Sequence, residues 1–244
     1  DNMEMAELHP DSIRFFNIDR DEIEKEMVTI KWDAEAAEKG GFEHFMMKEI
    51  HEQPKAVRDT IGAYAKDGDI DLSSLGISDE QFSNFKKVFI VACGSAYHVG
   101  MSAKYIMEDL TDVMVEVDLA SEYRYRNPKL SDDTLVVIIS QSGETADSLA
   151  ALRLTKERGV KTLGIVNVVG SSIAREADYV MYTLAGPEIA VATTKAYSTQ
   201  LICMYLLSMY MAKVRGEIDD TAFHDMMEEL VQLPDKIAEV LANK

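Results

Sequence analysis

The sequence has 244 residues, a length that suits one large α/β domain with extensions or two small domains. Hydrophobic residues make up 47% of it, enough to bury a sizeable core. The formal net charge of −18 argues against a binder of nucleic acids or membrane surfaces, because phosphate backbones and anionic lipids attract the opposite sign. A small anionic ligand is still possible, since backbone dipoles can hold one locally.

Cysteine usage bears on where the protein works. The two cysteines, Cys93 and Cys203, belong to no metal-ligand or redox spacing, which favours reduced thiols and a cytoplasmic location. The first residues show no basic and apolar leader pattern. The longest apolar stretch, LICMYLLSMYMA at 201–212, is too short to span a bilayer. We therefore expect neither a membrane segment nor a disulfide framework.

Residues 1–32 differ from the rest of the chain. Two strand-like runs, IRFFNI (13–18) and MVTIKW (27–32), flank the acidic stretch DRDEIEKE and predict a hairpin. A single hairpin is marginal in water, so it must pack on something larger. We expect 1–32 to be a piece of a neighbouring domain, 33–84 a linker with N-terminal helices, and 85–244 the main domain with C-terminal helices.

Helical patterns follow this first segment. Residues 33–41 are polar and end in two glycines, which indicates a linker or a short helix. Apolar residues then recur at helical spacing from Phe42 to about Lys66. Pro54 is expected to end or kink this helix near Gln53, because the residue before a proline avoids the helical region.

From Lys87 onward, near-continuous aliphatic runs alternate with helical segments. The runs are KVFIVAC (87–93), VMVEVDLA (113–120), TLVVIIS (134–140), KTLGIVN (161–167) and DYVMYTL (178–184). This alternation predicts an α/β fold: a doubly wound, five-stranded parallel sheet with helices on both faces, like the flavodoxin sandwich. Two further helices, about 193–215 and 218–241, would pack outside the sheet, the second broken at Pro234. The first is apolar on nearly all faces, which favours an interior position.

Two strand ends carry unusual polar turns, VACGSAYH (91–98) and SQSGET (140–145). Each places glycine and hydroxyl residues between a buried strand and the start of a helix. Ligands of open parallel sheets bind beyond the carboxyl ends of the strands, where unpaired helix amides carry partial positive charge. Gly143 would let the backbone approach a ligand closely. The chemistry indicates an anion site, and most simply a phosphate site.

Simpler interpretations remain open for single residues. Ser142 or Thr145 alone could cap a helix, although six polar or glycine positions exceed what one cap needs. A third stretch, GPEIAVATTKAYSTQ (186–200), could cap the long helix or contact a ligand with equal ease. His98 is best explained as a structural histidine. Neither GxxxxGK[ST] nor GxGxxG occurs, so we expect no nucleoside triphosphate, no dinucleotide and no other cofactor or metal.

Three motifs together resemble the SIS (sugar isomerase) family of phosphosugar-binding domains. They are ACGSAYHVG (92–100), SQSGETADSLAAL (140–152) and EIAVATTKAYSTQ (188–200). A fourth and more specific one, WDAEAAEKGGFEHFMMKEIHEQP (32–54), is similar to the linker and first helices of the glutamine-dependent aminotransferases of that family. The resemblance covers about residues 13–240 and makes 1–32 similar to the end of a glutaminase domain.

The resemblance also implies which residues bind substrate. The family's phosphate ligands correspond here to Ser140, Gln141, Ser142 and Thr145. The loop that lines the sugar corresponds to Cys93, Gly94 and Ser95, and the third loop to Val191 and Thr193. One departure is Ala96, where a second hydroxyl is common. Without that hydroxyl the site has one potential phosphate donor fewer, and a neutral hydrogen bond is worth about 0.5–1.5 kcal/mol.

Enzymes of this kind take ammonia from glutamine with an N-terminal cysteine and deliver it to fructose 6-phosphate held by two SIS domains. The residues that open the sugar ring lie in the second SIS domain. The resemblance therefore implies a fragment that binds fructose 6-phosphate or glucosamine 6-phosphate, pairs as a homodimer, and has no catalytic residue of its own.

Two alternatives differ in class. A regulatory phosphosugar sensor is disfavoured by the acidic charge and by the lack of a helix-turn-helix segment. A stand-alone phosphosugar isomerase would need a complete catalytic base, and the nearest carboxylates, Glu144 and Glu188, are better explained as structural or capping groups.

Overall fold

A computed structural model describes residues 3–26 and 38–243 of the chain. The chain divides into two compact units, Asp1–Lys31 and Trp32–Lys244. Among the described residues, no helix has the length and apolar character needed to cross a membrane.

The first unit is a small antiparallel sheet. Its strands, in the order β1-β2-β3, are Met5–Leu8, Ile13–Phe16 and Glu22–Ile23. The predicted strand 13–18 is thus shorter than expected, and its partners are β1 and β3. The backbone turns after β2 because Asn17 binds Asp21 through both main chain and side chain, so β3 forms inside the stretch predicted as a turn. The second predicted strand, 27–32, and residues 33–37 of the polar stretch 33–41 lie outside the described residues.

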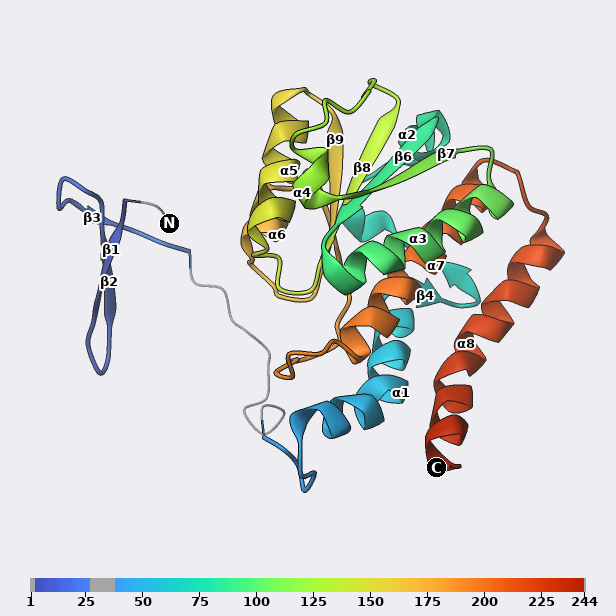
Figure 1. Cartoon of the computed structure of the whole chain (residues 1–244), viewed down its shortest axis with the longest axis horizontal. Helices are drawn as coiled ribbons and strands as arrows, with labels where there is room; N and C mark the ends of the chain where they lie inside the picture. The colour runs from blue at the N-terminus through green and yellow to red at the C-terminus, as the bar shows by residue number, and fades with distance from the viewer. Residues whose placement is uncertain (1–2, 27–37, 244) are drawn as a thin grey trace. The chain divides into compact units, whose positions relative to one another are not determined.

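The second unit contains a five-stranded sheet in which every neighbouring pair is parallel. The strands are β6 (Lys87–Ala92), β7 (Met114–Leu119), β8 (Thr134–Ser140), β9 (Lys161–Val166) and β10 (Tyr179–Tyr182), in the order β10-β9-β8-β6-β7. Each predicted strand forms within two residues of its expected ends. The predicted doubly wound sheet is confirmed (Figure 1).

Helices cover both faces of this sheet. The helices of this unit are α1 (Phe45–Tyr64), α2 (Asp79–Asn84), α3 (Gly94–Leu110), α4 (Ala120–Tyr123), α5 (Ala146–Glu157), α6 (Ser172–Glu176), α7 (Lys195–Val214) and α8 (Asp220–Ala242). Helices α1 and α8 pack on α7 rather than on the sheet itself. A short hairpin, β4 (Ala65–Lys66) and β5 (Asp69–Ile70), and a 3₁₀ turn at Ser73–Leu75 join α1 to α2, and the sequence did not predict them or α2.

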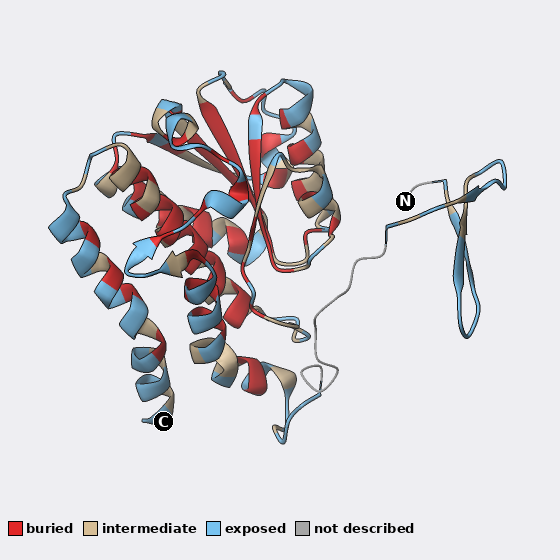
Figure 2. Ribbon diagram, turned by 180° about the vertical axis from the view of Figure 1, so that it is seen from behind, coloured by how far each residue is buried: buried red, intermediate tan, exposed pale blue. Residues whose placement is uncertain are grey.

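Side chains alternate between two cores, one on each face of the sheet. Val88 and Ile90 of β6 pack with α3 and α7, whereas Phe89 and Val91 pack with α4, α5 and α6. All four are fully buried, as the strands of a sheet covered on both faces should be (Figure 2). The predicted interior position of α7 is confirmed, because α1 and α3 both pack on it within this one chain.

Neither proline ends its helix, which corrects the predicted end of the first helix near Gln53 and the predicted break at Pro234. Helix α1 runs without a break through Pro54, and α8 runs through Pro234. Proline cannot donate to the carbonyl four residues earlier. In α1 the Gln53 side chain takes over this role and donates to the Ile50 carbonyl at 3.2 Å. In α8 the proline lies on the buried face, where tertiary packing supports the helix.

Candidate functional site

The candidate site lies where the chain order of the sheet reverses. From β6 the chain continues to β7 on one side and then to β8 on the other, which opens a crevice beyond the carboxyl ends of β6 and β8. A pocket of about 230 Å³ occupies this position. It is lined by Cys93, Ser95, Ala96, Ile139, Ser140, Gln141, Ser142, Thr145, Glu188, Ala190, Val191, Thr193 and Gln200.

Eight of the nine residues predicted to bind substrate line this one pocket. The exception is Gly94, which lies between two lining residues as the first residue of α3. The structure thus brings together three loops that are about 50 residues apart in sequence. The prediction omitted Ala96, Ile139, Glu188, Ala190 and Gln200, which also line the pocket. Gln200, one turn into α7, closes the sequence motif 188–200 and could have been included on that ground.

A larger groove of about 470 Å³ lies elsewhere, between α3, α7 and α8. Its walls are mainly apolar side chains such as Ile106, Tyr205 and Leu233. It has no cluster of hydroxyl groups and no convergent helix starts. The smaller polar pocket is therefore the better candidate for an anionic ligand.

The turn after β8 is held by its own hydroxyl groups. The Ser140 Oγ accepts a hydrogen bond from the Gly143 amide at 3.1 Å and lies 3.1 Å from the Thr145 Oγ1. The Ser142 Oγ accepts from the Glu144 amide at 3.2 Å. Thr145 occupies the N-cap position of α5, but its hydroxyl makes no capping hydrogen bond. Simple helix capping therefore does not explain these hydroxyls.

Two helix starts meet at the pocket and leave amides unused. In the described part of the chain, the amides of Ala146, Asp147 and Ser148 at the start of α5 have no hydrogen-bond acceptor. The first residues of α3 include Ser95 and Ala96, which line the same pocket. The Ser148 Oγ lies 3.8 Å from the Cys93 Sγ, so the two starts are neighbours. Such amides carry partial positive charge, and together with hydroxyl donors they can hold an anion.

Gly143 is required for a reason that the sequence did not predict. Its φ of +66° favours glycine, and a Cβ at this position would lie 2.1 Å from the Ser171 Oγ. The close neighbour that a side chain at this position would meet is the loop before α6. The Gly143 carbonyl accepts from the Ile173 amide at 3.0 Å, and Glu144 accepts from the Ser172 amide at 2.7 Å. These bonds anchor the turn to the start of α6.

The capping interpretation of the two nearby carboxylates is confirmed. Glu144 caps α6, as described above. Glu188 accepts from the amides of Thr194 and Ala196 at 3.0 and 3.2 Å, at the start of α7, and from the Thr193 hydroxyl at 3.1 Å. Its negative charge thus faces the positive end of a helix, which limits its repulsion of an anion in the pocket.

The remaining polar candidates lie outside the pocket. Lys195 is buried, and its Nζ donates to Glu52 of α1 at 2.7 Å. His98 is exposed, and its ring lies against that of Tyr97 with centroids 5.4 Å apart. Over residues 3–26 and 38–243 there is no group of three or more His, Cys, Asp or Glu side chains that could hold a metal ion.

Comparison with known proteins identifies the family. The model of the SIS domain family matches residues 81–210, which is more than half of the chain. Curated relatives include the glutamine–fructose-6-phosphate aminotransferases (isomerizing) of Clostridium tetani, 51% identical over 95% of this chain, and of Caldanaerobacter subterraneus, 50% identical over 100% of this chain. The chain spans only 38% and 40% of the length of these two relatives.

A solved structure agrees with this result. The C-terminal domain of the glucosamine–fructose-6-phosphate aminotransferase from Francisella tularensis is 44% identical and superposes with a TM-score of 0.77. The match covers 81% of this chain and 55% of that one. The predicted resemblance and fold are both confirmed. This chain belongs to the SIS domain family, and over nearly all of its length it is similar to a part of glutamine–fructose-6-phosphate aminotransferases.

Proposed function

We propose that this chain is the first SIS half of a glutamine–fructose-6-phosphate aminotransferase and that it binds fructose 6-phosphate or glucosamine 6-phosphate. One observation carries the proposal: hydroxyl groups and unused helix amides from separate strand ends line one pocket. This arrangement provides several short hydrogen-bond donors around one space, which suits a phosphate group. The aminotransferase relatives support the identity of the sugar.

In the proposed complex the phosphate is held by the Ser140–Thr145 turn and the start of α5. The sugar then extends toward the Cys93–Ser95 loop and toward Val191 and Thr193. Fixing the phosphate places the carbonyl end of the sugar in a constant position, which lowers the entropic barrier to amination and isomerisation. Ala96 supplies no hydroxyl, so the amides at the start of α3 take a larger share of the binding.

Catalysis by the isolated chain is not part of the proposal. Both carboxylates near the pocket already accept hydrogen bonds from helix amides, which disfavours a stand-alone isomerase. Ring opening requires residues of a second SIS domain. We expect the isolated chain to bind the ligand without turning it over, and we expect the complete enzyme to work in the cytoplasm as a homodimer.

The small N-terminal sheet fits the same proposal as the end of a glutaminase domain. Its apolar side chains Met5, Leu8 and Ile13 are at least half exposed. Three short strands with an exposed apolar face are not expected to be stable alone. The remainder of a larger domain would cover them.

Titration with glucosamine 6-phosphate tests the proposed function. We expect saturable shifts of the Ser142 and Thr145 amide signals in NMR spectra. The variants Ser142→Ala and Thr145→Val should each weaken binding at least tenfold, because a hydrogen bond to a charged group contributes about 1.5–3 kcal/mol. Ser102→Ala, on α3 and outside the pocket, is the control. Unperturbed amides at millimolar ligand would refute the proposal.

A further inference from the structure

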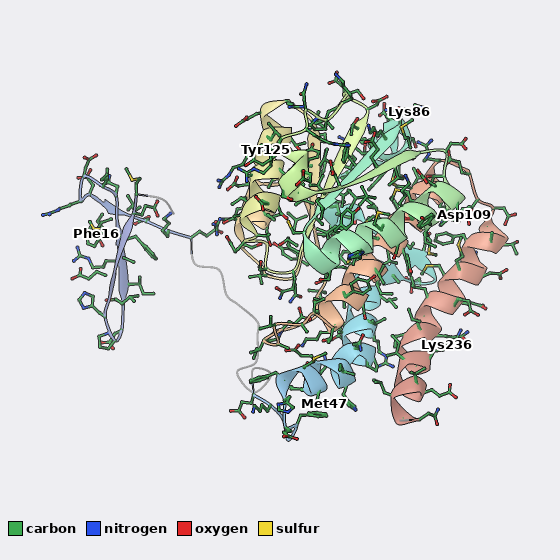
Figure 3. All side chains as sticks on the ribbon, in the orientation of Figure 1. Phe16, Met47, Lys86, Asp109, Tyr125 and Lys236 are labelled. Atoms are coloured by element: carbon green, nitrogen blue, oxygen red, sulfur yellow. The ribbon has the colours of Figure 1, made fainter. Side chains whose placement is uncertain are left out.

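Helix α1 lies outside the segment that matches the SIS family model, yet it contacts the wall of the pocket. Figure 1 draws the start of α1 beside the loop that precedes α7, and Figure 3 labels Met47 in the first turn of this helix. Side chains three or four positions apart share a helix face. The α1 side chains on this face that bond to the loop or its flanks are Glu49, Glu52, Gln53, Thr60 and Tyr64.

Glu49 holds the middle of the loop. Its Oε1 accepts hydrogen bonds from the amides of Ile189 at 2.7 Å and Ala190 at 3.0 Å. The residue is only 2% exposed, and it lies 140 positions before Ile189 in the sequence. Ala190 and the adjacent Val191 line the pocket. A buried carboxylate from a distant helix thus sets the position of the backbone that forms one pocket wall.

The two ends of the loop are held separately. At its start, the Tyr64 hydroxyl donates to the Tyr182 carbonyl at 2.9 Å and accepts from its amide at 2.8 Å. Burial raises the pKa of Tyr64, so this hydroxyl keeps its proton. At its end, Lys195 binds Glu52, and the Ser198 hydroxyl donates to the Gln53 side chain at 2.6 Å.

The middle of the loop has no comparable support from apolar packing. Ile189 is 46% exposed and Val191 is fully exposed. Among the described residues, no side chain other than Glu49 bonds to the backbone amides of 188–193. The Ser140–Thr145 turn differs, because its own hydroxyls and the start of α6 hold it without α1. Loss of Glu49 should therefore release one wall of the pocket and leave the other in place.

We propose that Glu49 is a positioning residue that sets the third loop for the sugar part of a hexose phosphate. It thereby makes the pocket prefer a sugar phosphate over inorganic phosphate. This proposal rests on the proposed function, since it assigns the Ser140–Thr145 turn to the phosphate and the third loop to the sugar. Glu49 touches no ligand itself and acts through the amides of Ile189 and Ala190.

The affinities of two ligands for the 244-residue chain test the proposal. Inorganic phosphate probes the turn alone, and glucosamine 6-phosphate probes the turn and the third loop together. In Glu49→Ala we expect the affinity for glucosamine 6-phosphate to fall about tenfold, equivalent to about 1.4 kcal/mol. The affinity for inorganic phosphate should stay within about twofold. Glu49→Gln should retain most of the preference, because the amide oxygen can accept the same two hydrogen bonds.

Further variants separate positioning from general stability. Glu49→Asp keeps the carboxylate but shortens the side chain, so it should lose part of the preference even if Glu49→Ala folds poorly. Asp59→Ala, an exposed position on the same helix, is the matched control and should change neither affinity. Equal losses for both ligands, in step with a lowered Tm, would assign Glu49 a purely structural role and overturn the proposal.

Hydrogen exchange distinguishes failure of this proposal from failure of the proposed function. The amides of Ile189 and Ala190 should exchange faster in Glu49→Ala than in the wild type, with no change in Asp59→Ala. Unchanged exchange at both amides would overturn the positioning role, whatever the ligand data. If the wild-type chain binds neither ligand, the proposed function fails, and the preference for sugar phosphate fails with it.

Discussion

The two walls of the pocket are built in different ways. The Ser140–Thr145 turn is closed by hydroxyls within the turn and by the start of α6, about 30 residues further on. The loop before α7 is closed at its end by its own Glu188, but its middle and its start are held by carboxylate and hydroxyl groups of α1, more than 100 residues earlier. The first wall is thus a local structure that one short motif specifies. The second depends on how a separate helix packs against the sandwich.

Substitution of Gly143 gives the largest expected loss of stability. Alanine there adds left-handed strain of about 1–2 kcal/mol and a clash with Ser171 worth about 1–3 kcal/mol. Urea unfolding should show the sum of both effects. Gly159→Ala, which has a similar φ of +72° and no atom within 4 Å of the added Cβ, should show the strain alone. Equal effects of the two substitutions would contradict the tight fit of the local turn.

Breaking the ion pair between Lys195 and Glu52 of α1 should cost less stability than substitution of Gly143. Lys195 is 2% exposed, and Lys195→Met leaves Glu52 with Lys48 at 3.6 Å as its remaining cation. Removing one partner of a fully buried pair costs about 3–5 kcal/mol, and because Glu52 is partly exposed we expect about 1–3 kcal/mol. Lys55→Met, which breaks the exposed pair with Asp59, should cost at most about 1 kcal/mol. If both variants lose the same stability, α1 does not hold the loop through Lys195.

The smallest expected effect concerns the ion pair between α5 and α6, whose contribution to stability should depend on pH. Glu176 of α6 accepts two hydrogen bonds from Arg153 of α5, at 2.7 and 2.6 Å. The hydrogen bonds and charge of Arg153 lower the pKa of Glu176, against a smaller opposing effect of burial. A lowered pKa means that the ionised carboxylate stabilises the fold above the ordinary glutamate pKa, and that this stability is lost as pH falls through the lowered value.

Glu176→Gln should therefore cost at most about 1 kcal/mol at neutral pH, since the pair is partly exposed. The difference from the wild type should shrink as pH falls below about 4.3, the ordinary glutamate pKa. Urea unfolding of both proteins across this range measures it, with Glu157→Gln at the end of α5 as the control. A difference that stays constant with pH would show that the carboxylate charge contributes nothing.

Local patterns predicted the parts of the fold that depend on near neighbours. Continuous aliphatic runs predicted the five strands because a sheet covered on both faces buries every side chain. The local proline rule did not predict that the helix continues past Pro54, where the Gln53 side chain supplies the donor that proline lacks. Local reasoning also failed in the first unit, where the side chain of Asn17 closes the turn earlier than the apolar pattern indicates.

The candidate site likewise combines residues that local motifs predicted with a residue that they did not predict. The three motifs at 92–100, 140–152 and 188–200 contain eight lining residues that were predicted, and they lie together because strand ends of a parallel sheet meet at one edge. Glu49 was not predicted to take part. In the sequence it is one of many glutamates on a helical segment, and it carries no signal that it will be buried against Ile189 and Ala190.

By itself the sequence determined the layered sheet, the hydroxyl-rich turn and the family, because each depends on residues close together in the chain or on motifs that can be compared directly. Only the tertiary structure decided how α1 supports the third loop, why Gly143 must be glycine, and that Lys195 points away from the pocket. These features depend on which distant surfaces pack together. That outcome reflects the shape and burial of the whole unit rather than any local pattern.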